Sequence, residues 1–498
     1  MNALTGTGAL LRLLVRRDRL RLPIWVLAIV GLVYSSASAV QGLYPTQADL
    51  DLYASTIGDS AASIVMSGPA TAVDTIGGVT VFEVNSSAII ATALMAIFLT
   101  VRHTRAEEES GRTELLRATV LGRFASVAAP LILVCLASVA VSAGILLSML
   151  SLGLAPAGAL VYAASILMVG ISFTAVAALA AQLTEHARGA IGLSAAVLAI
   201  SFVLRGIGDI GHNALSWLSP IGWSQAVHAF GGDRWWPLAI SVGFAALSLL
   251  MALVIVEHRD MGAGIVAPRP GPARLSARVN GPFGLALRQQ RGSIAGWTVG
   301  MLLGGVAFGS VGREVNDLVS ARPDLAQVFT VGGAEIVDAF FGTAMLVLAL
   351  VAAGFTIGSV LRLRAEEAAG RAEPVLATSV SRWRWALSGL SVAVLGTVLV
   401  VSAGGLGTGL AHAIATGDVA QIPRLLGAAL AYLPATLVMG ALAGLLIGWL
   451  PRAASAVWGV LAVSFVVGWL GGVLDIPHWL SESVPFSHVP TVPAAELT

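Results

Sequence analysis

The sequence contains no lysine, and all 28 of its basic residues are arginine. A Walker A phosphate-binding loop needs a lysine to reach the β- and γ-phosphates of a nucleotide, so this chain carries no such loop of its own. Cysteine is nearly absent, because Cys135 is the single copy, and one cysteine excludes an intrachain disulfide. The eight histidines are scattered, without the spacing of a metal site. We therefore expect neither a metal nor a cofactor in this chain.

Charge is also scarce. Charged residues make up 11% of the sequence, whereas soluble domains carry about 25%. Hydrophobic residues account for 57%, and the mean hydropathy is +0.87. The apolar residues form runs of roughly 18 to 27, which are long enough to cross a bilayer as helices. The composition therefore predicts an all-α integral membrane protein.

Apolar runs that end at charges or at Pro/Gly clusters mark the membrane spans. They predict eleven transmembrane helices, near 22–41, 85–102, 124–150, 158–182, 190–207, 237–256, 294–311, 339–361, 385–411, 424–449 and 455–474.

The distribution of arginine sets the orientation of these spans. With the N-terminus inside, all but five of the 28 arginines fall on the inner side; the five are Arg205, Arg234, Arg313, Arg322 and Arg424. Cytoplasmic loops of membrane proteins carry such an excess of arginine. The sequence therefore predicts a multi-pass protein with a cytoplasmic N-terminus.

One long inner connection divides the chain. It contains Pro268, Pro270 and Pro272 among Gly and Arg, a composition that favours an extended, unpacked linker. We expect a first transmembrane half at 1–256, a cytoplasmic linker with a short interfacial helix at 257–292, and a second transmembrane half at 293–498.

The two halves contain the same charged segment between their second and third spans. Between 105–123 and 364–382, ten of nineteen positions are identical. They include Arg105, Glu107, Glu108, Gly111, Arg112 and Glu114, which recur as Arg364, Glu366, Glu367, Gly370, Arg371 and Glu373, and also Ala118-Thr119 and Arg123, which recur as Ala377-Thr378 and Arg382. The same number of spans precedes each copy, so the halves run parallel. We call 105–114 and 364–373 the first and second Arg/Glu segments.

A helical Arg/Glu segment would set Glu108 against Arg112, four residues on, where opposite charges pair. Gly111 would end that helix or let the backbone of a partner approach. A basic inner loop needs arginine only, so the repeated glutamate pair and glycine favour a more specific role. We interpret each segment as a short charged helix on which a cytoplasmic protein could act.

These residues resemble the permease subunits of ABC-2 type exporters. The Arg-x-Glu-Glu-x-x-Gly-x-x-Glu stretches at 105–114 and 364–373 lie where that family has its coupling helices. The stretch from Ser219 to Pro237 is similar to the outer connection between the fifth and sixth spans in duplicated permeases of actinobacterial antibiotic and multidrug exporters, the tetronasin-type group. The resemblance covers nearly the whole chain.

The resemblance implies two homologous halves of six spans each in a bacterial plasma membrane. It also implies a separate ABC ATPase, in two copies, which would hold ATP and magnesium and act on the two coupling segments. The substrate would be a hydrophobic or amphipathic compound, and the chain would be a transport subunit rather than an enzyme. No nucleic-acid partner is implied.

The pattern departs from the family at the C-terminal end. Pro220 aligns with Pro485, and the same offset would start a twelfth span near residue 501, beyond Thr498. We expect the sequence to lack a twelfth helix.

Two other functions fit parts of the pattern. A proton-coupled drug antiporter of the major facilitator type also has two parallel six-span halves, but it needs ionisable groups within the membrane, and these spans are nearly free of them. A membrane glycosyltransferase could use Asp49 and Asp51 of the first outer loop, yet that chemistry gives the repeat no role.

Overall fold

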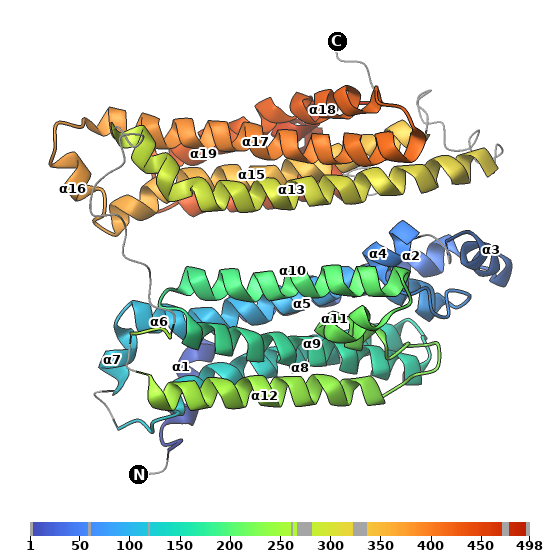
Figure 1. Ribbon diagram of the computed structural model, residues 1–498, viewed down its shortest axis with the longest axis horizontal. Coiled ribbons are helices and arrows are strands. Elements are labelled where there is room, and N and C mark those ends of the chain that lie inside the picture. The colour runs from blue at the N-terminus through green and yellow to red at the C-terminus, as the bar shows by residue number, and fades with distance from the viewer. Residues whose placement is uncertain are drawn as a thin grey trace. The chain divides into compact units, whose positions relative to one another are not determined.

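The computed structural model describes residues 3–57, 61–117, 120–259, 262–265, 281–321, 336–470 and 478–494. Within these ranges every regular element is a helix (Figure 1). Ten of the helical stretches are long and apolar enough to cross a membrane, which confirms the prediction of an all-α membrane protein. The chain forms two compact units, Met1–Pro270 and Gly271–Thr498, and each is described by itself.

The first unit carries six of these spans together with several short helices. Its elements are α1 (Thr7–Arg17), α2 (Arg21–Leu43), α3 (Gln47–Ile57), α4 (Ala61–Ser67), α5 (Ile76–His103), α6 (Arg105–Glu109), α7 (Arg112–Arg117), α8 (Ala125–Ser151), α9 (Pro156–Leu183), α10 (Ala187–Ile210), η1 (Ala214–Leu218), α11 (Pro220–Gln225) and α12 (Trp236–His258).

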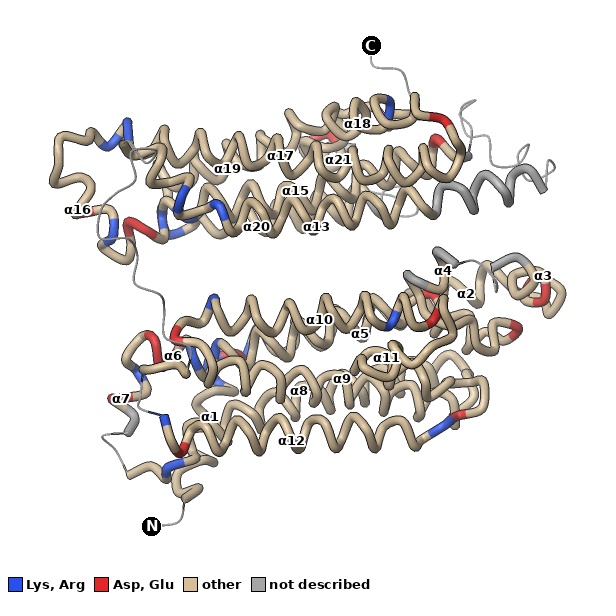
Figure 2. Tube along the Cα trace, in the orientation of Figure 1, with Lys and Arg blue, Asp and Glu red and all other residues tan. Residues whose placement is uncertain are grey.

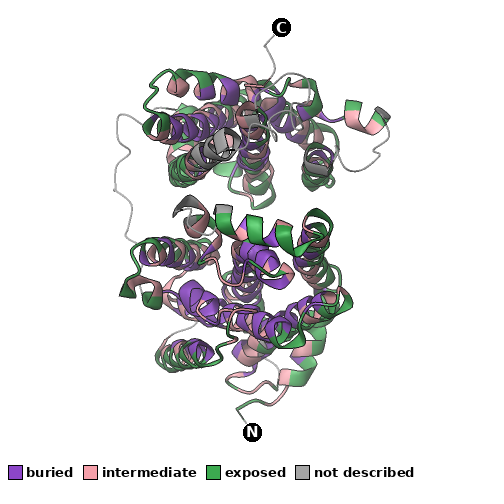
Figure 3. Ribbon diagram, turned by 90° about the vertical axis from the view of Figure 1, so that its right-hand side faces the viewer, coloured by how far each residue is buried: buried purple, intermediate pink, exposed green. Residues whose placement is uncertain are grey.

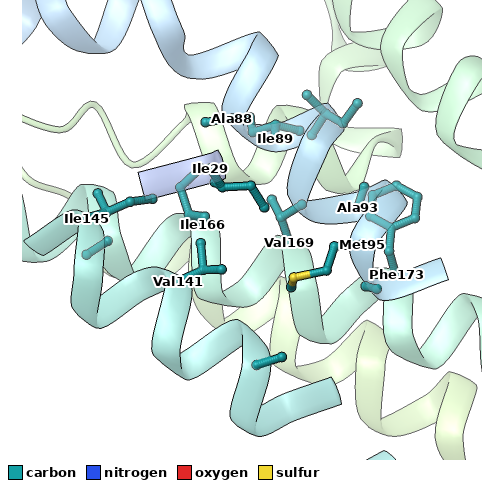
Figure 4. Close-up of a cluster of buried hydrophobic side chains, with 14 of the residues drawn as sticks. Ile29, Ala88, Ile89, Ala93, Met95, Val141, Ile145, Ile166, Val169 and Phe173 are labelled. Atoms are coloured by element: carbon teal, nitrogen blue, oxygen red, sulfur yellow. The ribbon is translucent and has the colours of Figure 1, made fainter. Parts of the chain in front are cut away.

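The core of the first unit lies around α5 and α9. These are its most buried spans, and α9 packs against α5, α8, α10 and α12. Side chains such as Met95, Val169 and Phe173 meet there (Figure 4). Close packing is possible because small residues line the contacts: a Cβ on Gly170 would lie 2.4 Å from the Ser138 hydroxyl oxygen. Figure 3 shows buried residues concentrated on helices in the interior of the unit that contains the N-terminus.

The connection between the fifth and sixth spans folds back as a short buried helix. Ser219 precedes α11, and its hydroxyl accepts hydrogen bonds from the Ile221 and Gly222 amides, both at 3.2 Å. The same hydroxyl donates to the Ser201 carbonyl oxygen at 2.7 Å. All six residues of α11 are buried. This N-cap anchors the returning helix onto α10.

The second unit begins with a long helix and is similarly organised. Its elements are α13 (Gly281–Ala321), α15 (Ile336–Ala368), α16 (Glu373–Leu376), α17 (Arg382–Thr416), α18 (Gln421–Ala431), α19 (Leu433–Trp449), η2 (Ala454–Ala456), α20 (Val457–Leu470), α21 (His478–Glu482) and η3 (Pro485–His488). Helices α13 and α17 pack along each other, and α15 is the most buried span.

Two of the predicted spans in the second unit differ from a simple helix. The span at 424–449 is interrupted at Tyr432, between α18 and α19. Pro434 lies in the first turn of α19, and proline lacks the N–H that would continue the hydrogen-bond ladder from α18. The span at 455–474 is represented by α20, which has 14 residues; residues 471–474 lie outside the described ranges.

The interfacial helix expected within 257–292 is not a separate element in the described residues. Residues 281–292 are instead the first turns of α13. In the first unit the chain does break, after α1, and the buried carboxylate of Asp18 lies at that break. Arg16, Arg19 and Trp25 recur at one offset as Arg288, Arg291 and Trp297, and this offset places Gln290 at the position of Asp18. Gln290 lies within α13, and its side-chain oxygen accepts a 2.5 Å hydrogen bond from the Ser359 hydroxyl. The helix therefore continues at this position, where the first unit has a break.

Candidate functional site

Figure 2 shows charged residues gathered toward the ends of the helices in each unit. The first Arg/Glu segment follows α5 directly and forms α6 and the start of α7. Its counterpart begins within the last turn of α15 and continues through a turn into α16. The first segment therefore follows α5, one of the two most buried spans of its unit, and the second segment begins at the end of α15, the most buried span of its unit. A displacement of either segment would move a helix of the core.

The first segment is fixed by Arg105, which is 1% exposed. Its Nη1 donates to Glu108 Oε2 at 2.7 Å, and its Nη2 donates to the carbonyl oxygens of Gly262 and Ala263 at 2.9 and 3.1 Å. A buried guanidinium must be paired in this way, since an unpaired buried charge is strongly destabilising. Arg105 thus joins α6 to the chain that leaves α12.

Glu108 is the centre of this arrangement. Arg259 Nη2 lies 2.9 Å from each of its carboxylate oxygens, and the Gly262 amide donates to Oε1 at 3.1 Å. Together with Arg105, these contacts enclose the carboxylate. We call Arg105, Glu108, Arg259 and the Gly262–Ala263 backbone the clamp.

Glu107 connects the segment to the N-terminal helix. Its carboxylate lies 2.6 Å from Arg17 Nη1 at the end of α1 and 3.5 Å from Arg112 Nη1. Close by, Asp18 is fully buried; its Oδ2 lies 2.5 Å from His103 Nε2, and its Oδ1 lies 3.4 Å from Arg102 Nε. The first segment is therefore held from the α1 side as well as from the α12 side.

The second segment repeats the inner ion pairs of the first. Arg364 Nη1 pairs with Glu367 Oε2 at 2.9 Å, as Arg105 pairs with Glu108. Arg371 Nε donates to Glu366 Oε2 at 2.8 Å, as Arg112 pairs with Glu107. Identical residues therefore make equivalent pairs in the two units.

The expected pairing of Glu108 with Arg112 is wrong. Gly111 has a φ of 73° and Gly370 a φ of 70°, a left-handed conformation that L-residues with a Cβ rarely adopt. This turn ends the helix, so the four-residue register is lost and Arg112 reaches Glu107 instead. A Cβ at either glycine would meet no atom within 4 Å, so the glycines serve the backbone conformation rather than a close contact.

Several charges of the two segments remain exposed. Glu114 lies in the first turn of α7 and Glu373 in the first turn of α16, where a carboxylate is favoured by the helix dipole. Both are exposed. The Arg112 and Arg371 side chains are 59% and 53% exposed. In contrast, the side chains of Glu107, Glu108 and Glu366 are 12 to 14% exposed.

The clamp brings together residues that the sequence analysis did not connect. Arg259 lies 151 positions from Glu108, and it lies at the start of the predicted linker. Arg17 and Asp18 belong to neither copy of the repeated Arg/Glu segment. No spacing signal could have joined them. Among the described residues, no group of three His, Cys, Asp or Glu side chains is placed to hold a metal ion.

Sequence comparison gives this arrangement its context. Residues 279–498 match a family described as "Multidrug efflux system permease Rv1217c, C-terminal domain". The chain is also similar to the multidrug efflux system permease protein Rv1217c of Mycobacterium tuberculosis (strain ATCC 25618 / H37Rv). The two are 38% identical over 499 residues, which cover 99% of this chain and 90% of the relative. The chain belongs to this permease family, of the ABC-2 exporter type.

The family assignment decides between the alternatives. It favours a transport subunit over an enzyme, and an ABC-2 permease over a major facilitator antiporter or a glycosyltransferase. With ten membrane-spanning helices in the described residues, the chain is a multi-pass membrane permease.

Proposed function

We propose that this chain is the membrane subunit of an ATP-driven exporter of hydrophobic and amphipathic compounds, and that a separate ATPase docks on its two Arg/Glu segments. One observation carries the docking part of the proposal. Equivalent residues of the two units form the same ion pairs and the same glycine turn, and each leaves a glutamate and an arginine exposed: Glu114 and Arg112 in one unit, Glu373 and Arg371 in the other.

Each segment has a buried side and an exposed side. The buried side consists of Glu107 with Glu108 in the first unit, and of Glu366 in the second. These carboxylates hold the segment to its helices by ion pairs. The exposed side presents charges of both signs, which suits a protein surface better than a membrane or a nucleic acid, because single-sign patches are typical of the latter partners.

Because each unit has one exposed side of an Arg/Glu segment, we expect two copies of the ATPase, one for each unit. The ATPase would hold ATP and magnesium, since the present chain has no lysine for a Walker A loop. The ATPase would bind from the cytoplasm, and this places the N-terminus and both Arg/Glu segments on the inner face of a bacterial plasma membrane. The excess of arginine at that end supports this orientation.

The substrate class follows from the relative and from the apolar spans. The named relative is a multidrug efflux permease, and the spans of the present chain hold few charges that would solvate an ion or a free sugar. A lipophilic compound needs no such groups.

The experiment is reconstitution. The chain is co-expressed with a candidate P-loop ATPase from the same genome, and the complex is purified on a tag carried by the permease. Proteoliposomes are then tested for ATP-dependent movement of a lipophilic dye. The proposal expects co-purification and transport that needs both subunits and hydrolysable ATP. Transport that proceeds without the ATPase, driven by a proton gradient, would contradict it.

A further inference from the structure

A large cavity lies at the end of the first unit opposite the Arg/Glu segment. It is formed by the ends of α4 and α10 with η1 and α11 and has a volume of about 860 Å³. Figure 1 shows α4 and α11 at this end of the unit. Ligand pockets typically have volumes of about 300–1,000 Å³. The cavity is therefore large enough for a drug-sized molecule.

The wall of the cavity is tied together by buried polar contacts. Arg205, which is fully buried, donates from Nη1 to the Ile64 carbonyl oxygen at 2.9 Å and lies 3.7 Å from Asp209 Oδ2. Ser216 donates to Asp209 Oδ1 at 2.8 Å, and Gln225 Nε2 donates to the Ser67 carbonyl oxygen at 3.0 Å. These bonds link all four elements of the wall, so the cavity is preformed.

Two oxygen atoms in this wall lack hydrogen bonds. Asp209 Oδ2 and Gln225 Oε1 are buried and have no hydrogen-bond donor within the described part of the chain. The 3.7 Å separation from Arg205 is an ion-pair distance, too long for a hydrogen bond. Both residues line the cavity. Because buried polar atoms are almost always hydrogen-bonded, two unsatisfied acceptors on one cavity indicate a ligand that donates.

The remaining wall is largely apolar. Ile64, Ile210 and Trp217 line it, and the Trp217 ring stacks on Trp236 with centroids 5.0 Å apart. The Trp217 carbonyl oxygen accepts a 2.6 Å hydrogen bond from Trp223 Nε1, which fixes this part of the wall. A cavity lined by both an aromatic ring and a carboxylate suits a molecule with an apolar body and a donating, cationic end.

We propose that this cavity is a binding site for an amphipathic amine, whose ammonium donates to Asp209 Oδ2 and Gln225 Oε1 while its apolar part lies against Trp217. Arg205 offsets the charge of Asp209, so the site selects the ligand by hydrogen-bond donors as well as by charge. The inference rests on the proposed function in one respect: the ligand would be an exported compound near its point of release.

The second unit contains an apolar cavity that serves as a comparison. A cavity of about 490 Å³ lies between α19 and η3, lined by Pro434, Val438 and His488 among others. None of the described residues that line it has a buried side-chain oxygen or nitrogen without a hydrogen bond. The two unsatisfied acceptors therefore distinguish the cavity of the first unit from this apolar one.

Binding can be tested on the purified permease in detergent, without ATPase. The probe is dansylcadaverine, which has a primary amine, an apolar chain and a fluorophore that responds to polarity. The matched ligand is N-acetylated dansylcadaverine, which keeps the apolar part and loses the ammonium. A lost charge-assisted hydrogen bond is worth about 1.5–3 kcal/mol, so the acetylated ligand should bind about 10- to 100-fold more weakly.

Two variants locate the site. Ala214→Trp adds an indole to the cavity wall, leaves the Arg205–Asp209 pair intact, and should abolish saturable binding of the probe. Asp209→Asn should weaken binding of the amine about tenfold or more and affect the acetylated ligand little. Asp51→Asn changes an exposed residue of α3 that does not line the cavity; it is the control and should bind as wild type.

Wild-type binding in the Ala214→Trp variant would overturn the proposal, as would equal binding of the two ligands or the absence of saturable binding, which would mean that solvent alone occupies the cavity. ATP-driven transport of a dye without an amine separates this outcome from the proposed function. Such transport can succeed when the amine site fails, and amine binding can persist when transport fails.

Discussion

Arg259 and Glu108 form an ion pair that connects the end of the sixth span to the first Arg/Glu segment. The guanidinium Nη2 lies 2.9 Å from both carboxylate oxygens, and the two residues are 151 positions apart in the sequence. Both side chains are largely buried. The pair therefore makes the position of the segment depend on the chain that leaves α12.

Removing this arginine should loosen the first segment without unfolding the bundle. Arg259→Ala leaves Glu108 with Arg105 and the Gly262 amide, and the loss of a buried charge-assisted contact costs about 1.5–3 kcal/mol. We expect amide hydrogen exchange in 105–114 to rise about tenfold or more, with little change in 364–373. Arg188→Ala, an exposed arginine at the start of α10, is the matched control. Equal exchange in the two variants would show that the clamp does not hold the segment.

The glycine turns should resist substitution. Gly111→Ala and Gly370→Ala would each force an alanine into the left-handed region, at a cost of about 1 kcal/mol, although the space beside both residues is open. We expect lower apparent melting temperatures and weaker ATPase association for both. Gly192→Ala lies in a regular part of α10 with equally open space, and it should lower neither quantity. Tolerance of alanine at 111 and 370 would contradict the assigned role of the turn.

The buried carboxylate of Asp18 should be a major source of stability in the first unit. It lies against His103 and Arg102 with no exposure to solvent, and removal of one partner from a buried charge cluster costs about 3–5 kcal/mol. Asp18→Ala should therefore strongly lower the melting temperature of the purified protein. Asp49→Ala changes an exposed carboxylate of α3 and is expected to cost far less. Similar melting temperatures for the two variants would exclude this role.

Much of this architecture could be predicted from the sequence, because hydropathy reports directly on the membrane environment. The helix breaks could not. The span at 85–102 begins nine residues earlier, at Ile76, because Gly77, Gly78 and Thr80 are buried by packing despite their low hydropathy. The break at Tyr432 and the unbroken α13 depend on local backbone geometry, which the mean hydropathy of a segment does not report.

The charged site was only partly predictable for a similar reason. The repeat identified Arg105, Glu108 and Gly111 correctly as related to Arg364, Glu367 and Gly370, but it assigned the wrong ion pair. It also could not separate buried from exposed charges. Glu108 and Glu114 look alike in the sequence, yet tertiary contacts from Arg259 enclose the first and leave the second exposed.

Protonation of His228 should destabilise the end of the first unit that contains α11. Burial, with a smaller contribution from Arg234, lowers the pKa of His228 below its usual 6.5. The unfolded chain therefore binds a proton more readily than the folded chain, so stability is full above pH 6.5 and falls as the pH drops below it. His228→Asn, which tolerates the positive φ of 48° at this position, should reduce that decline. A parallel pH dependence of the melting temperature in variant and wild type would contradict this prediction.

The central claim is that the ATPase binds the exposed charges of the two Arg/Glu segments. Reversal of these charges tests the claim most directly. The amount of ATPase that co-purifies with the permease is compared for wild type, for the double variant Glu114→Arg with Glu373→Arg, and for Asp51→Arg as a control. Like charges facing each other across an interface cost several kcal/mol. We predict that the affinity of the double variant for the ATPase falls on the order of 100-fold, and that Asp51→Arg retains the ATPase. The melting temperature of the double variant should fall only slightly, because each exposed carboxylate in a first helical turn contributes about 0.3–1 kcal/mol. Full ATPase retention by the double variant would contradict the account.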